Sequence, residues 1–199
     1  MNPLFGNGAK CVFDDFGPTP GEPVILIHGR PSHRSVQVPQ TAAPTAAGHR
    51  GIAPDLRGCG ENPATEEESP RAASAGDPAE PLRGPGIERT VVGGVSKGGR
   101  IATGPGLRHP GLVRALVLSD TSPAPETAEG AAFRRRTAER LLTEGTGPYA
   151  AGLIDTMLAP SDVTGQPEAS ARVGAMKRAT GPRVRRPADG APEAVKWPI

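Results

Sequence analysis

One stretch restricts the fold more than any other part of the chain: residues 90–100, Thr-Val-Val-Gly-Gly-Val-Ser-Lys-Gly-Gly-Arg. The β-branched pair Val91 and Val92 favours the end of a buried strand, and glycines then surround a single hydroxyl at Ser96. A serine on a sharp strand-to-helix turn needs neighbours without bulk, which Gly94 and Gly98 provide in a G-x-S-x-G pattern. We therefore expect Ser96 to lie on a strained turn with its hydroxyl accessible.

The context of this pattern matters because a chain with 27 glycines produces it by chance at a noticeable rate. A second glycine-flanked strand end lies about seventy residues earlier, at Val-Ile-Leu-Ile-His-Gly-Arg-Pro over 24–31. Its four apolar residues without alternation favour a strand covered on both faces. Ligands of parallel sheets bind beyond the carboxyl ends of the strands, where His28-Gly29 and Ser96 both fall. These two segments are therefore expected to form one site.

The remaining strands and helices predict an α/β fold. An antiparallel edge strand is expected within 10–17, and further strands at 49–55, 88–93 and 113–120, alternating with connections typical of βαβ units. This arrangement predicts a mostly parallel sheet with flanking helices. Amphipathic helices are expected at 131–143 and 149–158, with a weaker one at 169–178. A helix over 99–108 should be broken or short, because Gly104-Pro105-Gly106 interrupts it.

Composition and charge exclude several classes of function. Glycine and proline make up about a quarter of the 199 residues, and Leu, Ile, Val and Phe under a fifth, so we expect a thin core with loose ends. The net charge of +2, without basic tracts interleaved with aromatics, gives no case for nucleic acid. Cys11 and Cys59 form no metal-ligand grouping, which indicates a reduced compartment and neither metal nor cofactor. Without a membrane-span pattern or a signal sequence, the chain is expected to be cytoplasmic.

Three segments, taken together and in order, resemble the α/β-hydrolase superfamily. They are residues 26–31, residues 52–60, and residues 91–99 running on through 108–110 to 113–120. Residues 118–121 followed by 134–145 are most similar to the branch of 3-oxoadipate enol-lactonases and related esterases. The resemblance implies an α/β-hydrolase core over 1–123, incomplete in its last strands, and a partial helical cap over 124–180. A disordered tail is expected over 181–199.

The resemblance also implies roles for individual residues. Ser96 would be the nucleophile that attacks a carboxylic ester or lactone, and the backbone N–H groups of Arg30 and Lys97 would form the oxyanion hole. His28, Gly29, Gly94 and Gly98 would support these motifs. Epoxide and haloalkane substrates are disfavoured, because relatives acting on them carry an aspartate where this chain has Ser96.

The departures from the family concern the base and the acid. The family places a histidine near the end of the chain, whereas this sequence has none after His109, which a helix would carry ~20 Å from Ser96. His28 belongs to the oxyanion turn, and His33 and His49 match no base position. Asp120, at the end of the strand before the cap, is the one acid candidate; a turn or helix-cap role for it is the more common alternative.

Three hypotheses remain open from the sequence. The chain is an ester or lactone hydrolase, or it is a catalytically inactive truncated remnant of one. In the third, the strand ending at Asp120 binds a partner through an unpaired edge. The cationic side chains of Arg30 and Lys97 favour an anionic substrate, or they are merely tolerated beside the site.

Overall fold

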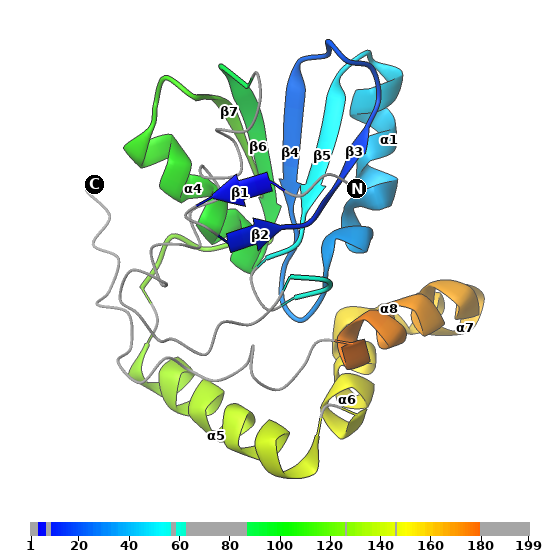
Figure 1. The fold of residues 1–199 in the computed structure, drawn as a ribbon. Helices are drawn as coiled ribbons and strands as arrows, with labels where there is room; N and C mark the ends of the chain where they lie inside the picture. The colour runs from blue at the N-terminus through cyan, green and yellow to red at the C-terminus, as the bar shows by residue number, and fades with distance from the viewer. Residues whose placement is uncertain are drawn as a thin grey trace. The chain divides into compact units, whose positions relative to one another are not determined.

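The computed structural model describes residues 4–6, 9–56, 59–62, 87–125, 127–145 and 147–179 (Figure 1). The chain divides into two compact units, residues 1–122 and residues 123–199. The first unit contains every strand of the described residues, and the second consists of helices. The predicted disordered tail over 181–199 lies outside the described residues, as do residues 63–86.

The first unit is built on a five-stranded sheet in the order β3-β5-β4-β6-β7. Its strands are β3 (Phe13–Phe16), β4 (Pro23–Ile27), β5 (Arg50–Pro54), β6 (Thr90–Val95) and β7 (Val113–Ser119). Strand β3 pairs with β5 antiparallel, and the other neighbouring pairs are parallel. The prediction of a mostly parallel sheet with an antiparallel edge is therefore confirmed. A separate antiparallel pair, β1 (Leu4–Gly6) with β2 (Ala9–Cys11), precedes the sheet.

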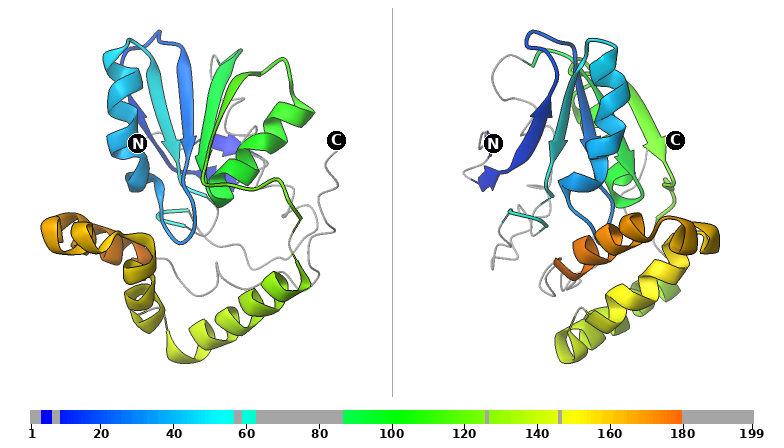
Figure 2. Two further views of the ribbon diagram at one scale, coloured as in Figure 1. Left: turned by 180° about the vertical axis from the view of Figure 1, so that it is seen from behind. Right: turned by 90° about the vertical axis from the view of Figure 1, so that its right-hand side faces the viewer.

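Helices α1 (Val38–Ala46) and α4 (Lys97–Arg108) cover opposite faces of this sheet. A Cβ atom built on Gly51 of β5 would lie 3.1 Å from Thr41 of α1. The next residue, Ile52, belongs to the same buried cluster as Ala102 of α4. Because successive residues of a strand point to opposite faces, the two helices lie on different sides. Figure 2 shows α1 along β4 and β5, and α4 beside β6 and β7. A short 3-10 helix, η1 (Arg34–Gln37), leads into α1.

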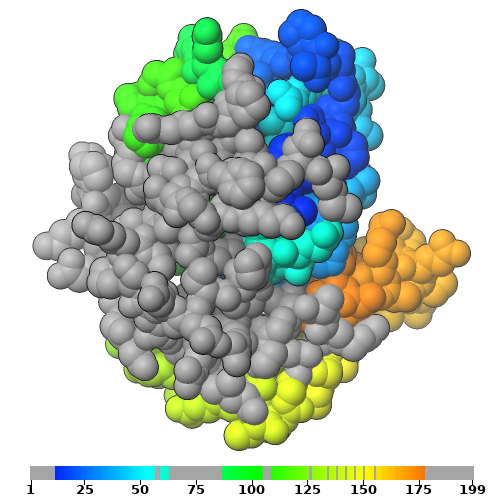
Figure 3. Space-filling model, in the orientation of Figure 1, coloured from blue at the N-terminus to red at the C-terminus, as the bar shows by residue number. Residues whose placement is uncertain are grey.

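Strand β7 forms one edge of the sheet, and its apolar side chains are exposed. Leu116, Val117 and Leu118 keep 40%, 55% and 46% of their surface accessible. In the space-filling view, the green surface belongs to the segment that contains α4 and β7, and it lies beside the blue and cyan surface of residues 12–56 (Figure 3). Among the described strands, β7 has a hydrogen-bonded neighbour on one side only, which is β6.

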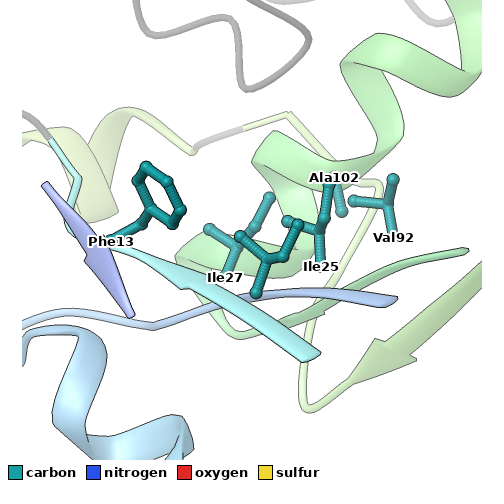
Figure 4. Packing of buried hydrophobic residues seen from close by; sticks show 6 residues of the cluster. Phe13, Ile25, Ile27, Val92 and Ala102 are labelled. Atoms are coloured by element: carbon teal, nitrogen blue, oxygen red, sulfur yellow. The ribbon is translucent and has the colours of Figure 1, made fainter. Parts of the chain in front are cut away.

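The core of the first unit lies between the sheet and α4. Its buried side chains come from β3, β4, β5, β6 and α4, namely Phe13, Ile25, Ile27, Ile52, Val92 and Ala102 (Figure 4). Full burial of an Ile or Phe side chain contributes ~1.5–3 kcal/mol, so these few residues supply much of the stability of the unit. They also fix the carboxyl ends of β4 and β6 relative to each other.

Helix α4 corrects one prediction. The Gly-Pro-Gly sequence at 104–106 led us to expect a broken or short helix, but α4 runs without interruption for 12 residues. Pro105 removes one intrahelical hydrogen bond, and glycine lowers helix propensity. The helix nevertheless packs along β6 and β7 and buries Ala102 completely. Tertiary packing therefore outweighs the local propensity here.

The second unit contains four helices among its described residues. They are α5 (Ala128–Glu144), α6 (Gly147–Met157), α7 (Pro160–Gly165) and α8 (Pro167–Ala179). The predicted amphipathic helices at 131–143 and 149–158 correspond to α5 and α6, and the weaker patch falls within α8. Thr127 caps α5 by accepting a hydrogen bond from the Gly130 N–H. Lys177 Nζ lies 2.9 Å from Met157 Sδ and joins α8 to α6. Of the helices in the described ranges, none is both long and apolar enough to span a membrane.

Candidate active site

Ser96 lies on the turn between the end of β6 and the start of α4. Its φ angle is 52°, in the left-handed region that non-glycine residues rarely adopt. Its N–H donates to the Ser119 carbonyl (2.9 Å), and its own carbonyl accepts from the Gly99 N–H (3.1 Å) and from Thr121 Oγ1 (2.8 Å). The backbone of Ser96 is therefore held on both sides while the residue itself is exposed. Such held strain concentrates at functional sites.

The glycines around Ser96 are required by close backbone contacts. A Cβ atom on Gly94 would lie 2.3 Å from the carbonyl carbon and oxygen of Gly98. A Cβ atom on Gly98 would lie 2.3 Å from the Ile27 carbonyl oxygen at the end of β4. These distances are below any real Cβ contact, so the first turn of α4 reaches β4 and β6 only because both positions lack side chains.

The turn after β4 lies directly beside Ser96. A Cβ atom on Gly29 would lie 3.3 Å from Ser96 Cβ and 3.2 Å from the Val95 carbonyl oxygen. The structure thus brings together the two glycine-flanked segments that the sequence places about seventy residues apart. The backbone of Arg30 follows immediately, and the backbone of Lys97 begins α4, whose N-terminus carries the positive end of the helix dipole. The turn after β4 and the first turn of α4 therefore lie next to each other at Ser96.

His28 holds this turn with both ring nitrogens. Its Nδ1–H donates to the Gly29 carbonyl (2.7 Å), and its Nε2 accepts the Leu56 N–H (2.9 Å). These partners assign the neutral Nδ1–H tautomer. The ring is completely buried. Burial lowers the pKa of His28, partly offset by its hydrogen bond to Gly29 and by the charge of Asp55. With both nitrogens engaged, His28 is placed to position backbone and not to accept a proton from Ser96.

The other three histidines, all of which lie in the described residues, form no hydrogen bond to Ser96. His33 precedes η1, His49 Nδ1 lies 3.7 Å from a Glu22 carboxylate oxygen, and His109 follows the far end of α4. Within the described ranges, which include all four histidines, no ring nitrogen forms a hydrogen bond to Ser96 Oγ.

Asp120 follows β7 and is the second non-glycine residue of the described chain with a positive φ, at 44°. It is exposed, and its neighbour Ser119 pairs in register with Val95, the residue before Ser96. The structure therefore places Asp120 at the carboxyl end of the strand next to the serine strand. No hydrogen bond in the described part of the chain joins it to a histidine.

Sequence reasoning missed the hydroxyl of Ser32. Ser32 Oγ donates to the Gly29 carbonyl (2.9 Å), so that oxygen accepts from two side chains. The available signal was the position of Ser32, three residues after Gly29, where serine commonly closes a turn onto the backbone. Gln37 Nε2 adds a bond to the Ile27 carbonyl (3.1 Å) just before the turn.

A buried ionic group that the sequence did not reveal joins this region to the loop after β5. The Arg34 guanidinium binds Asp55, Asp14 and Glu61. The backbone N–H of Arg34 also donates to Asp55 Oδ1 (2.7 Å). Burial by itself lowers the pKa of Arg34, but the hydrogen bonds to Glu61 and Asp14 and the charge of Asp55 raise it overall. Asn62 closes the loop by donating to the Asp55 carbonyl (2.6 Å) and accepting from the Val12 N–H (2.7 Å).

Comparison with known proteins decides the family. Residues 22–153 match the family described as alpha/beta hydrolase fold. The chain belongs to this family. The prediction made from the three sequence segments is thereby confirmed, together with its fold class.

Solved structures of this fold include two with close overall agreement. A thermophilic esterase from Thermogutta terrifontis is 31% identical, with a TM-score of 0.82; the match covers 96% of this chain and 71% of that chain. The enol-lactonase from Burkholderia xenovorans LB400 has a TM-score of 0.80 at 21% identity, over 90% of this chain and 68% of that one. The second likeness supports the fold alone.

Two curated relatives match by sequence. A protein of Variovorax paradoxus (strain S110) with the name "Putative carbamate hydrolase RutD" is 32% identical over 139 residues, which are 69% of this chain and 51% of that protein. A haloalkane dehalogenase of Psychrobacter cryohalolentis is 48% identical over 48 residues, 24% of this chain and 16% of the dehalogenase. The chain thus spans about half the length of the first relative and a smaller share of the second.

Proposed function

We propose that this chain is a serine hydrolase that cleaves a carboxylic ester or lactone with Ser96 as its nucleophile. The observation that carries the proposal is the strained turn at Ser96, with its positive φ, next to the glycine turn after β4. The esterase with 31% identity and the carbamate hydrolase relative support hydrolysis of an acyl bond. A dehalogenase activity is not proposed, because haloalkane-cleaving members of the resembled family carry an aspartate in place of Ser96.

The reaction follows from the arrangement around this turn. Ser96 Oγ would attack the carbonyl carbon, the carbonyl oxygen would become an oxyanion, and the alcohol would leave to give an acyl-serine. The N–H groups of Arg30 and Lys97 would donate to that oxyanion, and one such donor contributes on the order of 3 kcal/mol to lowering the barrier. Water would then release the acid product.

Asp120 is the acid that we propose for this site, on the β7 side of Ser96. Its role requires a base between the two residues, and no histidine of the described chain bonds to either of them. Acylation of Ser96 and complete turnover of an ester are therefore measured separately. The esterase and the carbamate hydrolase relative favour an active hydrolase over the inactive remnant, and the two readings differ in measurable ways.

The test uses a fluorophosphonate probe, which modifies activated serines, together with hydrolysis of a p-nitrophenyl ester. Wild type, Ser96→Ala and Asp120→Asn are compared, with Ser122→Ala as the matched control for loss of an exposed hydroxyl. We expect labelling of wild type and the control, no labelling of Ser96→Ala, and lower turnover in Asp120→Asn. Absence of labelling in correctly folded wild type would overturn the proposal and leave the inactive remnant.

A further inference from the structure

The structure shows how the peptide that carries the proposed Arg30 donor is held. The carbonyl of Gly29 accepts from His28 Nδ1 (2.7 Å) and from Ser32 Oγ (2.9 Å). A carbonyl oxygen has two lone pairs, so both are in use on this peptide. Rotation of the peptide would break both hydrogen bonds at once and leave the Nδ1–H of the buried His28 ring without an acceptor.

The peptide that ends in the Gly29 carbonyl begins with the Arg30 N–H. The Gly29–Arg30 bond is trans, and in a planar trans peptide the C=O and N–H bonds point in opposite directions. A carbonyl fixed toward His28 and Ser32 therefore fixes the Arg30 N–H toward the opposite side of the turn. Gly29 itself lies against Ser96, since a Cβ atom there would be 3.3 Å from Ser96 Cβ.

We propose that Ser32 and His28 are positioning residues that lock the Gly29–Arg30 peptide so that the Arg30 N–H is directed at the oxyanion site. The inference rests on the proposed function, because it assigns a task to a donor of that reaction. Neither side chain touches the reacting atoms; both act through the peptide. Ser32 is the more informative of the two, because it is only half-buried and its removal leaves the His28 contacts in place.

The connection continues from His28 to the loop after β5. His28 Nε2 accepts the Leu56 N–H, and Leu56 follows Asp55, the buried partner of Arg34. The position of the Arg30 N–H is therefore linked through His28 to the ionic group that fixes this loop. Ser32 supplies a second, independent hold on the same carbonyl.

The experiment compares Ser32→Ala with Ser32→Thr, which keeps the hydroxyl. Thr103→Ala serves as the control, since Thr103 Oγ1 also donates to a carbonyl three residues away, that of Arg100 (2.7 Å), within α4. Thermal unfolding first establishes that each variant is folded. The rate constant for fluorophosphonate labelling of Ser96 and the separate kcat and KM for a p-nitrophenyl ester are then measured. Both reagents develop negative charge on an oxygen that the Arg30 N–H would stabilise.

We expect Ser32→Ala to lower the labelling rate and kcat about tenfold with KM unchanged, because the interaction is made only in the transition state. Ser32→Thr should restore most of both, and Thr103→Ala should change neither. Labelling of wild type with equal rates in Ser32→Ala would overturn the positioning role alone, as would a loss confined to KM or to thermal stability. No labelling of wild type at Ser96 would instead overturn the proposed function, and the positioning role with it.

Discussion

The two strands beside the serine strand, β4 and β7, are alike in sequence and different in surroundings. Both pair with β6 in parallel, and both consist largely of Val, Ile and Leu. Ile25 and Ile27 of β4 are completely or almost completely buried, whereas Leu116 and Leu118 of β7 keep 40% and 46% of their surface. The burial differs because β4 has a hydrogen-bonded strand on each side and its isoleucines belong to the buried cluster, whereas β7 lies at the edge of the sheet.

The segments that follow these strands differ in the same way. After β4, His28 and Ser32 bond to the Gly29 carbonyl of the turn, and Gln37 bonds to the carbonyl at the end of the strand. After β7, Asp120 is exposed, and Thr121 Oγ1 provides one side-chain bond to the Ser96 carbonyl. The proposed oxyanion side of Ser96 is therefore built into the core, and the proposed acid side rests on an exposed edge. Four predictions test this contrast.

The largest effect is expected where the loop after β5 supports the β4 side. Asp55→Ala removes a fully buried carboxylate from the Arg34 ion pair and leaves part of that charge uncompensated. Breaking such a pair costs ~3–5 kcal/mol of unfolding free energy, which urea denaturation measures. The control is Asp15→Ala, whose ion pair with Arg50 is partly exposed and contributes less than ~1 kcal/mol. Equal losses in the two variants would contradict the structural role of the buried group.

The direct comparison of the two flanking strands is expected to give the next largest effect. Ile25→Ala should lower the unfolding free energy by ~3 kcal/mol, because it leaves a cavity in the core. Leu118→Ala, which removes a side chain of similar size from an exposed edge, should cost less than ~1 kcal/mol. Urea denaturation of both variants measures the difference, and similar losses would mean that β7 is covered in solution.

The sequence predicts the strands better than it predicts their burial. Uninterrupted apolar runs identify β4 and β7 equally well, because periodicity reports which residues suit a sheet and not what lies next to it. The positions of Ser96 and Gly29 beside each other follow from the rule that sites lie at the carboxyl ends of parallel strands. The local sequence pattern predicts the strands, and a general topological rule predicts that Ser96 and Gly29 lie close together.

Long-range contacts could not be predicted in this way. The Arg34 group joins residues from β3, η1 and the loop after β5, which no local pattern connects. Ser32 is an ordinary turn serine until the fold shows that His28 shares its acceptor. The continuous helix α4 was missed because packing against β6 and β7 outweighs the low propensity of its Gly-Pro-Gly sequence.

The next effect is a pH dependence of the unfolding free energy, which is expected from His28. Because burial lowers the pKa of His28 in the folded state, the unfolded chain takes up a proton near its ordinary pKa of 6.5 while the folded chain resists it. The unfolding free energy should therefore be constant above this pH, fall as the pH drops through 6.5, and level off below the folded pKa. The slope from this residue is at most ~1.4 kcal/mol per pH unit.

The variant His28→Asn tests this assignment, because asparagine keeps a donor near the Gly29 carbonyl but does not titrate. Urea denaturation between pH 5 and pH 8 should show a smaller slope in His28→Asn than in wild type. An unchanged slope would show that other groups cause the acid dependence. His49→Asn is the matched control, since His49 is only half-buried at the surface of the same unit.

The smallest effect concerns the two positive φ angles, at Ser96 and at Asp120. A left-handed conformation costs an ordinary L-residue ~1–2 kcal/mol, and glycine avoids this cost but loses ~0.5–1 kcal/mol through greater freedom of the unfolded chain. Ser96→Gly should therefore raise the unfolding free energy by ~0.5 kcal/mol. Asp120→Gly should change it by less than ~0.3 kcal/mol, because aspartate tolerates this region better than serine. Ser119→Gly, in the last position of β7, should lower it by ~1 kcal/mol. Thermal and urea unfolding measure all three. A gain at Asp120 as large as that at Ser96 would mean that the turn after β7 carries as much backbone strain as the turn after β6.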